Sequence, residues 1–197
     1  KRAPKQKANN YTQSSSHVLK RKLAMSAMKG KICIITGSNS GIGKETAIGL
    51  ATMGATSILA VRNQERGEKA RTEIVKQTGN NSVALMICDL SMMSSIRHFA
   101  AEFKKKYDRL DVLINNAGAT FSKREVTSEG FERNFAVNYL GPFLLTHELL
   151  DLLKSSVPSR IINVSSGLAK NGRVDLDDLQ SEKNYTRTKF HSSSRAP

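Results

Sequence analysis

The residues best placed to do chemistry in this chain gather in short polar stretches that directly follow apolar runs. The first stretch is "TGSNSGIG", which follows "KICII" and contains Gly37, Gly41 and Gly43. Glycine permits a sharp turn and lets a phosphate group approach the backbone N–H groups at the start of a helix. The pattern therefore predicts a phosphate-binding turn between a strand and a helix, with a turn that binds no ligand as the alternative.

Three later polar stretches follow apolar runs in the same way. They read "CDL" at residues 88–90, "NNAG" at residues 115–118 and "NVSS" at residues 163–166. Because the carboxyl ends of parallel strands meet at one edge of a sheet, we expect all four stretches to surround one site. The alternative for Ser165 and Ser166 is an ordinary turn or a helix cap.

Continuous apolar runs alternate with segments of helical periodicity along the chain. The runs predict strands at residues 31–37, 55–62, 82–90, 110–118 and 159–166, and the periodic segments predict helices at residues 41–54, 63–79, 91–107 and 127–156. In the first helix Ile42 and Ala47 are expected to share one apolar side, and Ser91 is expected to cap the third helix. Strands buried on both faces and joined by helices indicate an α/β fold, a doubly wound parallel sheet of the Rossmann type.

The net charge of +14 is unevenly distributed along the 197 residues. Residues 1–31 contain nine Lys/Arg and no acid, and the first acid is Glu45. Because residues 1–29 also hold few large apolar side chains, we expect them to form a basic, disordered leader. The alternative is that this leader contacts nucleic acid or an anionic membrane surface.

The cysteines, the histidines and the lengths of the apolar runs bear on redox compartment, metal binding and membrane insertion. Cys33 and Cys88 lie inside apolar runs and are expected to be buried thiols, as is typical of a reducing compartment. The four histidines are far apart, so no metal site is predicted. No apolar run reaches the ~18 residues of a membrane span. We therefore expect a cytoplasmic protein, or one peripheral to a membrane on its cytosolic side.

The polar stretches, together with "VNYLGPFLLT", resemble the short-chain dehydrogenase/reductase family in order and spacing over about residues 29 to 182. "LAVRNQERGEKA" and "GRVDLDDLQSEKNY" look most like its retinol-dehydrogenase-like branch. The resemblance implies a dinucleotide-binding, Rossmann-type domain at residues 30–182. It also implies hydride transfer between a nicotinamide cofactor and a carbonyl or alcohol of a small, apolar substrate, and a homodimer.

Charge at the end of the second predicted strand bears on the choice between NAD and NADP. NAD sites usually place an acid there for the ribose hydroxyls, whereas this chain has Arg62, with Lys44 just after the glycine turn. Two cations near the ribose suit a 2′-phosphate, which predicts NADP(H). The alternative is that Arg62 only pairs with a helix acid such as Glu65. The expected cofactor-binding residues are Gly37, Ser38, Asn39, Ser40, Gly41, Ile42, Gly43, Arg62, Asp89, Leu90, Asn116, Ala117 and Gly118.

The resemblance also implies catalytic residues. Ser166 matches the serine that holds the substrate oxygen, and Asn138 matches the asparagine that maintains a water relay. Tyr185 and Lys189 have the Tyr-x-x-x-Lys spacing of the family's acid–base pair. In that pair the lysine binds the nicotinamide ribose and lowers the pKa of a tyrosine whose ordinary value, near 10, is too high for proton exchange at neutral pH.

A second placement of the acid–base pair competes with the first. Carrying the retinol-dehydrogenase-like register forward puts the tyrosine position at His191 and the lysine position at Arg195, so that both residue types are replaced. Histidine exchanges protons near neutral pH and arginine keeps the positive charge, but neither reproduces the geometry of a phenol and a flexible ammonium group.

Residues 183–197 depart from the family pattern. "HSSSRAP" is poor helix material, and we expect a divergent C-terminal stub, with the C-terminal strands of the family's sheet missing and one sheet edge unpaired. Two functions besides an oxidoreductase therefore stay open. One is a catalytically inactive or truncated dinucleotide-binding protein, and the other is an interaction module that uses its basic leader.

Overall fold

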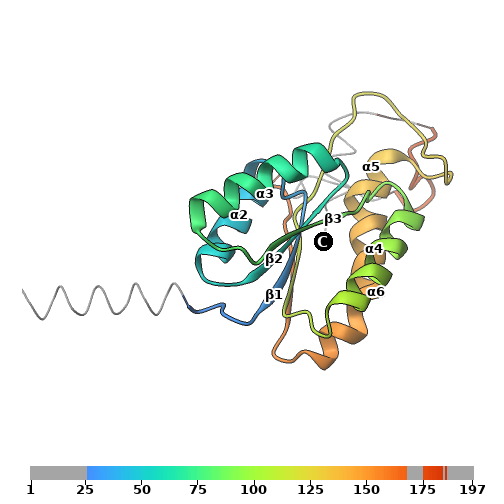
Figure 1. Cartoon of the computed structure of the whole chain (residues 1–197). Coiled ribbons are helices and arrows are strands. Elements are labelled where there is room, and N and C mark those ends of the chain that lie inside the picture. The colour runs from blue at the N-terminus through green and yellow to red at the C-terminus, as the bar shows by residue number, and fades with distance from the viewer. Residues whose placement is uncertain (1–25, 168–174, 184, 186–197) are drawn as a thin grey trace, which may run out of the picture.

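The computed structural model describes residues 26–167, 175–183 and 185, which contain a five-stranded sheet. Figure 1 shows this sheet between its helices. The strands are β1 (Ile32–Thr36), β2 (Thr56–Val61), β3 (Val83–Ile87), β4 (Val112–Asn115) and β5 (Arg160–Asn163). Their order is β3-β2-β1-β4-β5, and every neighbouring pair is parallel. The predicted doubly wound parallel sheet is therefore confirmed.

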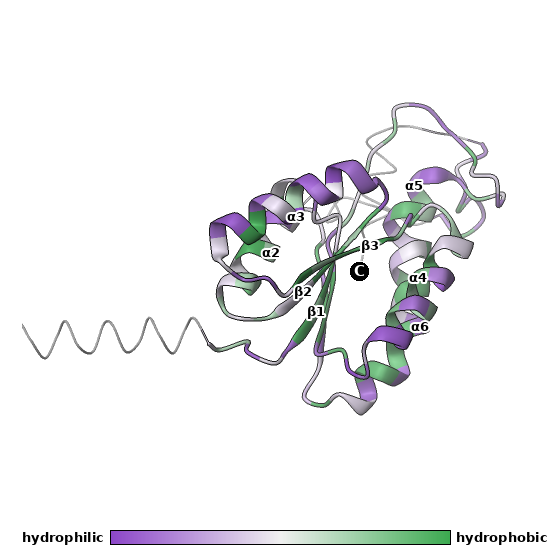
Figure 2. Cartoon of the chain, in the orientation of Figure 1, coloured by the Kyte–Doolittle hydropathy of each residue, from purple (hydrophilic) through white to green (hydrophobic). Residues whose placement is uncertain are grey.

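Helices cover both faces of this sheet. α2 (Gly41–Thr52) and α3 (Gln64–Thr78) pack on one face, and α4 (Met93–Lys106) and α6 (Gly141–Ser155) pack on the other (Figure 1). Neighbouring residues of β1 serve opposite faces: Ile35 belongs to the core under α2 and α3, and Ile34 belongs to the core under α4 and α6. Figure 2 shows the apolar strands between helices whose polar residues face outward. Because all the strands are parallel, their carboxyl ends and the polar stretches that follow them lie at one edge.

The helix predicted at residues 127–156 is interrupted. Residues 127–132 instead form a turn, in which the Thr127 N–H donates to the Phe131 carbonyl and Val126 bridges Glu132. The helical part then runs through α5 (Arg133–Phe135), a π-helix η1 (Ala136–Leu140) and α6. A Cβ atom at Gly141 would lie 2.5 Å from the Leu90 carbonyl oxygen, so the chain packs tightly against the end of β3 where the π-turn gives way to α6.

Two further local predictions were wrong. Met92, not Ser91, is the N-cap residue of α4, and the Glu129 carboxylate accepts from the N–H groups of Met93 (2.5 Å) and Ser94 (3.1 Å). The Ser91 hydroxyl donates to Asp89 instead (2.7 Å). Ile42, expected on the buried side of its helix, is 70% exposed. Its side chain lies beside a pocket rather than in the core.

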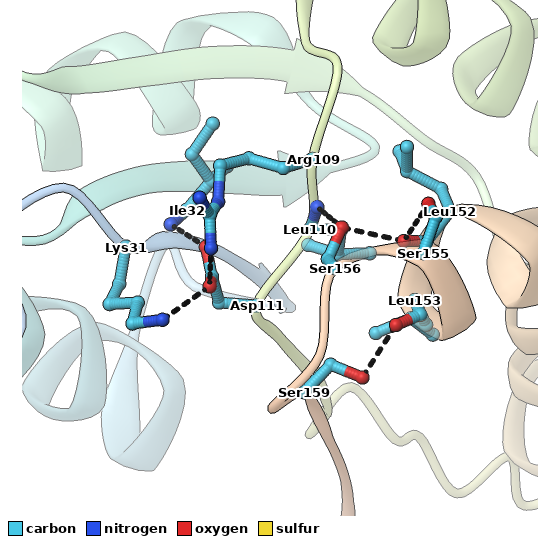
Figure 3. A network of polar contacts seen from close by, with 10 residues as sticks. All are labelled: Lys31, Ile32, Arg109, Leu110, Asp111, Leu152, Leu153, Ser155, Ser156 and Ser159. Carbon is cyan, nitrogen blue, oxygen red and sulfur yellow. Dashed lines mark hydrogen bonds and ion pairs between the residues drawn. The ribbon is translucent and has the colours of Figure 1, made fainter.

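A buried carboxylate ties the starts of β1 and β4 together at the opposite edge of the sheet (Figure 3). Asp111, 2% exposed, accepts from the Lys31 ammonium (2.8 Å), the Ile32 N–H (2.9 Å) and both Nε (3.0 Å) and Nη2 (2.5 Å) of Arg109. Burial alone would raise the Asp111 pKa. The hydrogen bonds from Arg109, Lys31 and Ile32 outweigh burial and lower the pKa from 3.8 to about 2.

The ends of the chain are described only in part. The last residues of the predicted leader form a turn on the domain, in which the Met28 N–H donates to the Met53 carbonyl at the end of α2 (3.0 Å). The remainder of that leader, and the stub apart from residues 183 and 185, lie outside the described residues. Within the described ranges no helix is both long and apolar enough to cross a bilayer.

Candidate functional site

A pocket of about 720 Å³ lies at the edge where the strands end, as the polar stretches predicted. All four stretches contribute to its lining. The predicted cofactor-binding residues that line it are Gly37, Asn39, Ser40, Ile42, Gly43, Arg62, Asp89, Leu90, Asn116, Ala117 and Gly118. Ser38 and Gly41 belong to the same turn without lining the pocket. The buried Ser38 hydroxyl donates to the Ile35 carbonyl (2.9 Å), and Gly41 begins α2 with φ +53°.

The glycine turn fits tightly against the end of β4. Gly37 has φ +65°, and a Cβ atom there would lie 2.9 Å from the Cα of Ala117. A Cβ atom at Gly43 would lie 2.6 Å from the Gly37 carbonyl oxygen and 2.4 Å from Asn116 Nδ2. Glycine is therefore required by conformation at Gly37 and by space at both positions.

Hydrogen bonds fix the turn and the end of β4 relative to each other. The Thr36 hydroxyl oxygen accepts from the N–H groups of Asn116 and Ala117, both at 2.9 Å. Asn116 Nδ2 donates in return to the Thr36 carbonyl (2.9 Å). The glycine-turn stretch and the stretch "NNAG" are thus joined into one floor of the pocket.

The start of α2 is suited to hold an anion. Its N-cap residue, Ser40, makes no side-chain capping bond, and its first turn contains no acid. The start of α3 differs, because the Asn63 side chain accepts there from the Arg66 N–H (2.8 Å). Uncapped N–H groups and the positive end of the helix dipole favour a phosphate at α2.

Two arginines line the pocket beyond the end of β2. Arg62 and Arg66 are both exposed, and neither belongs to a salt bridge found among the described residues, including the alternative pair of Arg62 with Glu65. The expectation for Lys44 was wrong, since its ammonium pairs with Glu73 of α3 and Lys44 does not line the pocket. Sequence reasoning missed Arg66, although its place four residues after Arg62, at the start of the predicted helix at residues 63–79, was a readable signal.

Ser166 and Asn138 occupy neighbouring parts of the site. Ser166, half-buried, lines the pocket with Ser165 just after β5. Asn138 lies in η1, where its Nδ2 donates to the Ala119 carbonyl (2.8 Å) and its Oδ1 accepts from the Ala119 N–H (2.9 Å). Because Ala119 lines the pocket, Asn138 holds the backbone of the pocket wall.

Tyr185 lies outside the pocket. Its hydroxyl donates to the Phe121 carbonyl and accepts from Asn134 Nδ2, each at 2.7 Å, and Tyr185 does not line the pocket. Burial raises the Tyr185 pKa, the Asn134 hydrogen bond opposes this, and the charges of Glu132 and Glu125 raise the pKa further. The net direction is the reverse of what proton exchange at neutral pH needs.

The other residues of the two acid–base placements, Lys189, His191 and Arg195, lie outside the described residues. Both placements therefore stay predictions. Cys88, predicted as a buried thiol, is 4% exposed and lines the pocket. Burial and the charge of Asp89 raise its pKa to about 12, which leaves the thiol protonated and unreactive at neutral pH. In the described part of the chain no group of His, Cys, Asp and Glu could hold a metal ion.

Comparisons with known proteins agree on one family. Its sequence profile, that of the short chain dehydrogenases, matches residues 31–183. Human retinol dehydrogenase 11 is 49% identical over 158 residues, which are 80% of this chain and 50% of that protein. Human retinol dehydrogenase 13 is 47% identical over 169 residues, 85% of this chain and 51% of that protein. The chain thus spans about half the length of the curated relatives it matches.

Comparison with solved structures also identifies similar proteins. An uncharacterised protein from Mycobacterium paratuberculosis superposes with a TM-score of 0.74 at 37% identity, covering 85% of this chain and 58% of that one. A short chain dehydrogenase from Escherichia coli CFT073, complexed with NADPH, superposes with a TM-score of 0.69 at 26% identity. That match covers 87% of this chain and 68% of the other.

Proposed function

This chain belongs to the short chain dehydrogenase family, in its retinol-dehydrogenase-like branch, and on that premise we propose that its pocket binds NADP(H). The activity proposed is that of an oxidoreductase acting on a carbonyl or alcohol carbon of an apolar, retinol-like small molecule. The solved E. coli relative complexed with NADPH supports a nicotinamide cofactor for this family. A homodimer stays a proposal that rests on the family resemblance.

The observation that carries the proposal is the distribution of anion-binding groups along the pocket. The N-terminus of α2, uncapped by Ser40, lies at the glycine turn and suits a pyrophosphate. Arg62 and Arg66 line the same pocket past the end of β2, at the place where an NAD site would carry an acid. Guanidinium groups form strong charge-assisted bonds with phosphate, which favours a 2′-phosphate over free ribose hydroxyls.

The chain's own residues then have separate tasks around the nicotinamide, which supplies or accepts the hydride. The Ser166 hydroxyl, in the pocket lining, would hold the substrate oxygen. Asn138 keeps the wall at Ala119 in place through its two hydrogen bonds. Because the Tyr185 hydroxyl is engaged with Phe121 and Asn134, we infer that the acid–base position falls in the second placement, at His191.

The position of Tyr185 also favours a second candidate function, a dinucleotide-binding protein with little or no turnover. In this case the pocket would retain its cofactor affinity while the phenol and lysine of the acid–base pair are replaced. The two candidates share the cofactor site and differ only in proton exchange. An assay of NADPH oxidation with apolar aldehydes separates them: turnover that is lost in His191→Ala supports the oxidoreductase, and saturable binding without turnover supports the second candidate.

Thermal unfolding with and without cofactor tests the shared part of both candidates. NADPH at about 100 times its Kd should add about 2.7 kcal/mol to the free energy of unfolding. We expect NADPH to raise the unfolding temperature more than NADH does at equal concentration. A transition that ignores both nucleotides would refute the cofactor site, and an equal shift with both would refute the preference for the 2′-phosphate.

A further inference from the structure

Three side chains hold the backbone of the turn at residues 119–121, where the pocket wall leaves β4. Asn138 bonds both the N–H and the carbonyl of Ala119 (2.9 and 2.8 Å). Two residues on, the Phe121 N–H donates to Asn134 Oδ1 (3.1 Å), and the Phe121 carbonyl accepts from the Tyr185 hydroxyl (2.7 Å). Both backbone groups of Ala119 and both of Phe121 thus have side-chain partners.

Asn134 has little freedom to take another orientation. It is 1% exposed, and its Nδ2 donates to Glu132 Oε1 (3.0 Å) and to the Tyr185 oxygen (2.7 Å) while its Oδ1 serves Phe121. Glu132, fully buried, also accepts from the backbone N–H of Asn134 (3.0 Å) and of Phe135 (2.8 Å). The Glu132 carboxylate therefore orients the Asn134 amide. The amide then offers one N–H to Tyr185 and its oxygen to Phe121.

The Tyr185 hydroxyl completes this arrangement. A phenol has a single proton to donate, and here that proton points to the Phe121 carbonyl while the oxygen accepts from Asn134. The cation–π contact of Arg133, whose guanidinium carbon lies 4.3 Å from the centre of the Phe121 ring, holds the side chain of the same residue. Phe121 is thus fixed through its N–H, its carbonyl and its ring.

The segment that carries Tyr185 is attached to this region at a second point. The Gln180 side-chain oxygen accepts from the Glu132 N–H (2.8 Å), and the Gln180 carbonyl accepts from Arg124 Nε (3.0 Å). Tyr185 reaches Phe121 across 64 positions of sequence. Residues 178–183 and Tyr185 therefore form a strap across the 121–134 region.

We propose that Tyr185 is a positioning residue: with Asn134 it pins the turn at residues 119–121 and so fixes the adjoining wall of the cofactor pocket, and it exchanges no proton with a substrate. The link from turn to pocket is short, because Ala117, Gly118 and Ala119 line the pocket and Phe121 is two residues further on. The effect on cofactor affinity rests on the proposed function, whereas the pinning of the turn does not.

The test compares Tyr185→Phe, which keeps the ring and removes the hydroxyl, with Tyr107→Phe as a matched control at the end of α4. Hydrogen exchange at the N–H groups of Ala119 and Phe121 is measured first. We expect about two- to tenfold faster exchange in Tyr185→Phe only, the effect of losing one net hydrogen bond. Equal exchange in the parent, Tyr185→Phe and Tyr107→Phe proteins would overturn the proposal.

NADPH affinity is the second readout, because a structural role unconnected with the pocket would leave it unchanged. We expect the NADPH Kd of Tyr185→Phe to rise about two- to tenfold and that of Tyr107→Phe to stay unchanged. An unchanged Kd would overturn the link to the pocket. If the parent chain binds neither NADPH nor NADH, the proposed function has failed, and the exchange comparison still decides whether Tyr185 pins the turn.

A third readout uses the unmodified chain, so it holds even if Tyr185→Phe fails to fold. The ring resonances of Tyr185 are followed by NMR as pH rises. A positioning tyrosine with the surroundings seen here should titrate above the ordinary value near 10. Titration of Tyr185 well below 10 would show the activated phenol of an acid–base catalyst and would overturn the proposal.

Discussion

At the scale of single residues, the proposed preference for NADP(H) depends on where the cations of the pocket lie. Arg62 and Arg66 line the pocket, whereas Lys44 is held by Glu73. We expect Arg62→Ala and Arg66→Ala each to weaken binding of 2′,5′-ADP by about tenfold or more, as the loss of a hydrogen bond to a charged group predicts. Titration of each variant with 2′,5′-ADP and with 5′-AMP measures this.

The matched control for these two variants is Lys44→Ala, which should leave both affinities unchanged. The 5′-AMP ligand lacks the 2′-phosphate, so its Kd should hardly change in the arginine variants. A loss of equal size for both nucleotides would mean that the arginines act on the shape of the pocket and do not contact the 2′-phosphate.

These residues also show what a sequence can and cannot reveal about the site. The glycine turn is predictable because a positive φ and a close approach leave no other residue type, as at Gly37. The partner of Lys44 is not, because Glu73 is 29 positions away and meets it only when α2 and α3 pack. Tyr185 likewise has the spacing of a catalytic residue, but its contacts come from residues 51 and 64 positions away.

At the scale of elements, helix α2 offers two glycines in contrasting surroundings. A Cβ atom at Gly43 would meet a side-chain atom at 2.4 Å and a backbone atom at 2.6 Å, whereas a Cβ atom at Gly49 would meet nothing within 4 Å. Gly43→Ala should lower the free energy of unfolding by roughly 1–3 kcal/mol, through overpacking, and weaken NADPH binding. Chemical denaturation and NADPH titration measure the two effects.

Gly49→Ala serves as the control for that change, since it adds the same methyl group to the same helix. It should raise the free energy of unfolding by up to ~1 kcal/mol, because alanine favours the helix over glycine, and it should leave NADPH binding intact. Equal effects of the two substitutions would contradict the tight fit of the glycine turn against β4.

The element boundaries show why hydrophobic periodicity alone did not predict where the helices begin and end. The apolar pattern at residues 127–156 is continuous, but the chain turns at Gly130, which has φ +85°, before α5 begins. Glu129, within that turn, caps α4 from 36 positions away and takes the role expected of Ser91. A cap supplied through tertiary contact has no local signature, so this contact becomes visible only once the turn and α4 lie together.

At the scale of the whole molecule, Asp111 ties together three strands at the edge opposite the pocket. Its carboxylate binds the start of β1, its N–H donates to the Ile32 carbonyl (2.9 Å), and its carbonyl accepts from the Arg160 N–H at the start of β5 (2.8 Å). The carboxylate and backbone of Asp111 together therefore hold the starts of β1, β4 and β5 in place.

Acid should protonate the Asp111 carboxylate and weaken its ion pairs with Lys31 and Arg109 in a defined range of pH. The Asp111 pKa is lowered on folding, from 3.8 to about 2, so its contribution to stability is complete above the unfolded value and is lost as pH falls through the folded value. That contribution is on the order of 2 kcal/mol at neutral pH. We expect Asp111→Asn to be less stable than the parent chain at pH 7 by at least this amount, because Lys31 and Arg109 then also lose their partner.

Denaturant unfolding of the parent, Asp111→Asn and the exposed control Asp108→Asn, measured between pH 7 and pH 2, tests this expectation. The gap between parent and Asp111→Asn should stay constant down to about pH 4 and narrow below it, since the parent carboxylate is then protonated more readily in the unfolded chain. Asp108→Asn should follow the parent. A gap that is unchanged down to pH 2 would mean that the difference does not depend on the Asp111 charge, and that this charge does not hold the strands together.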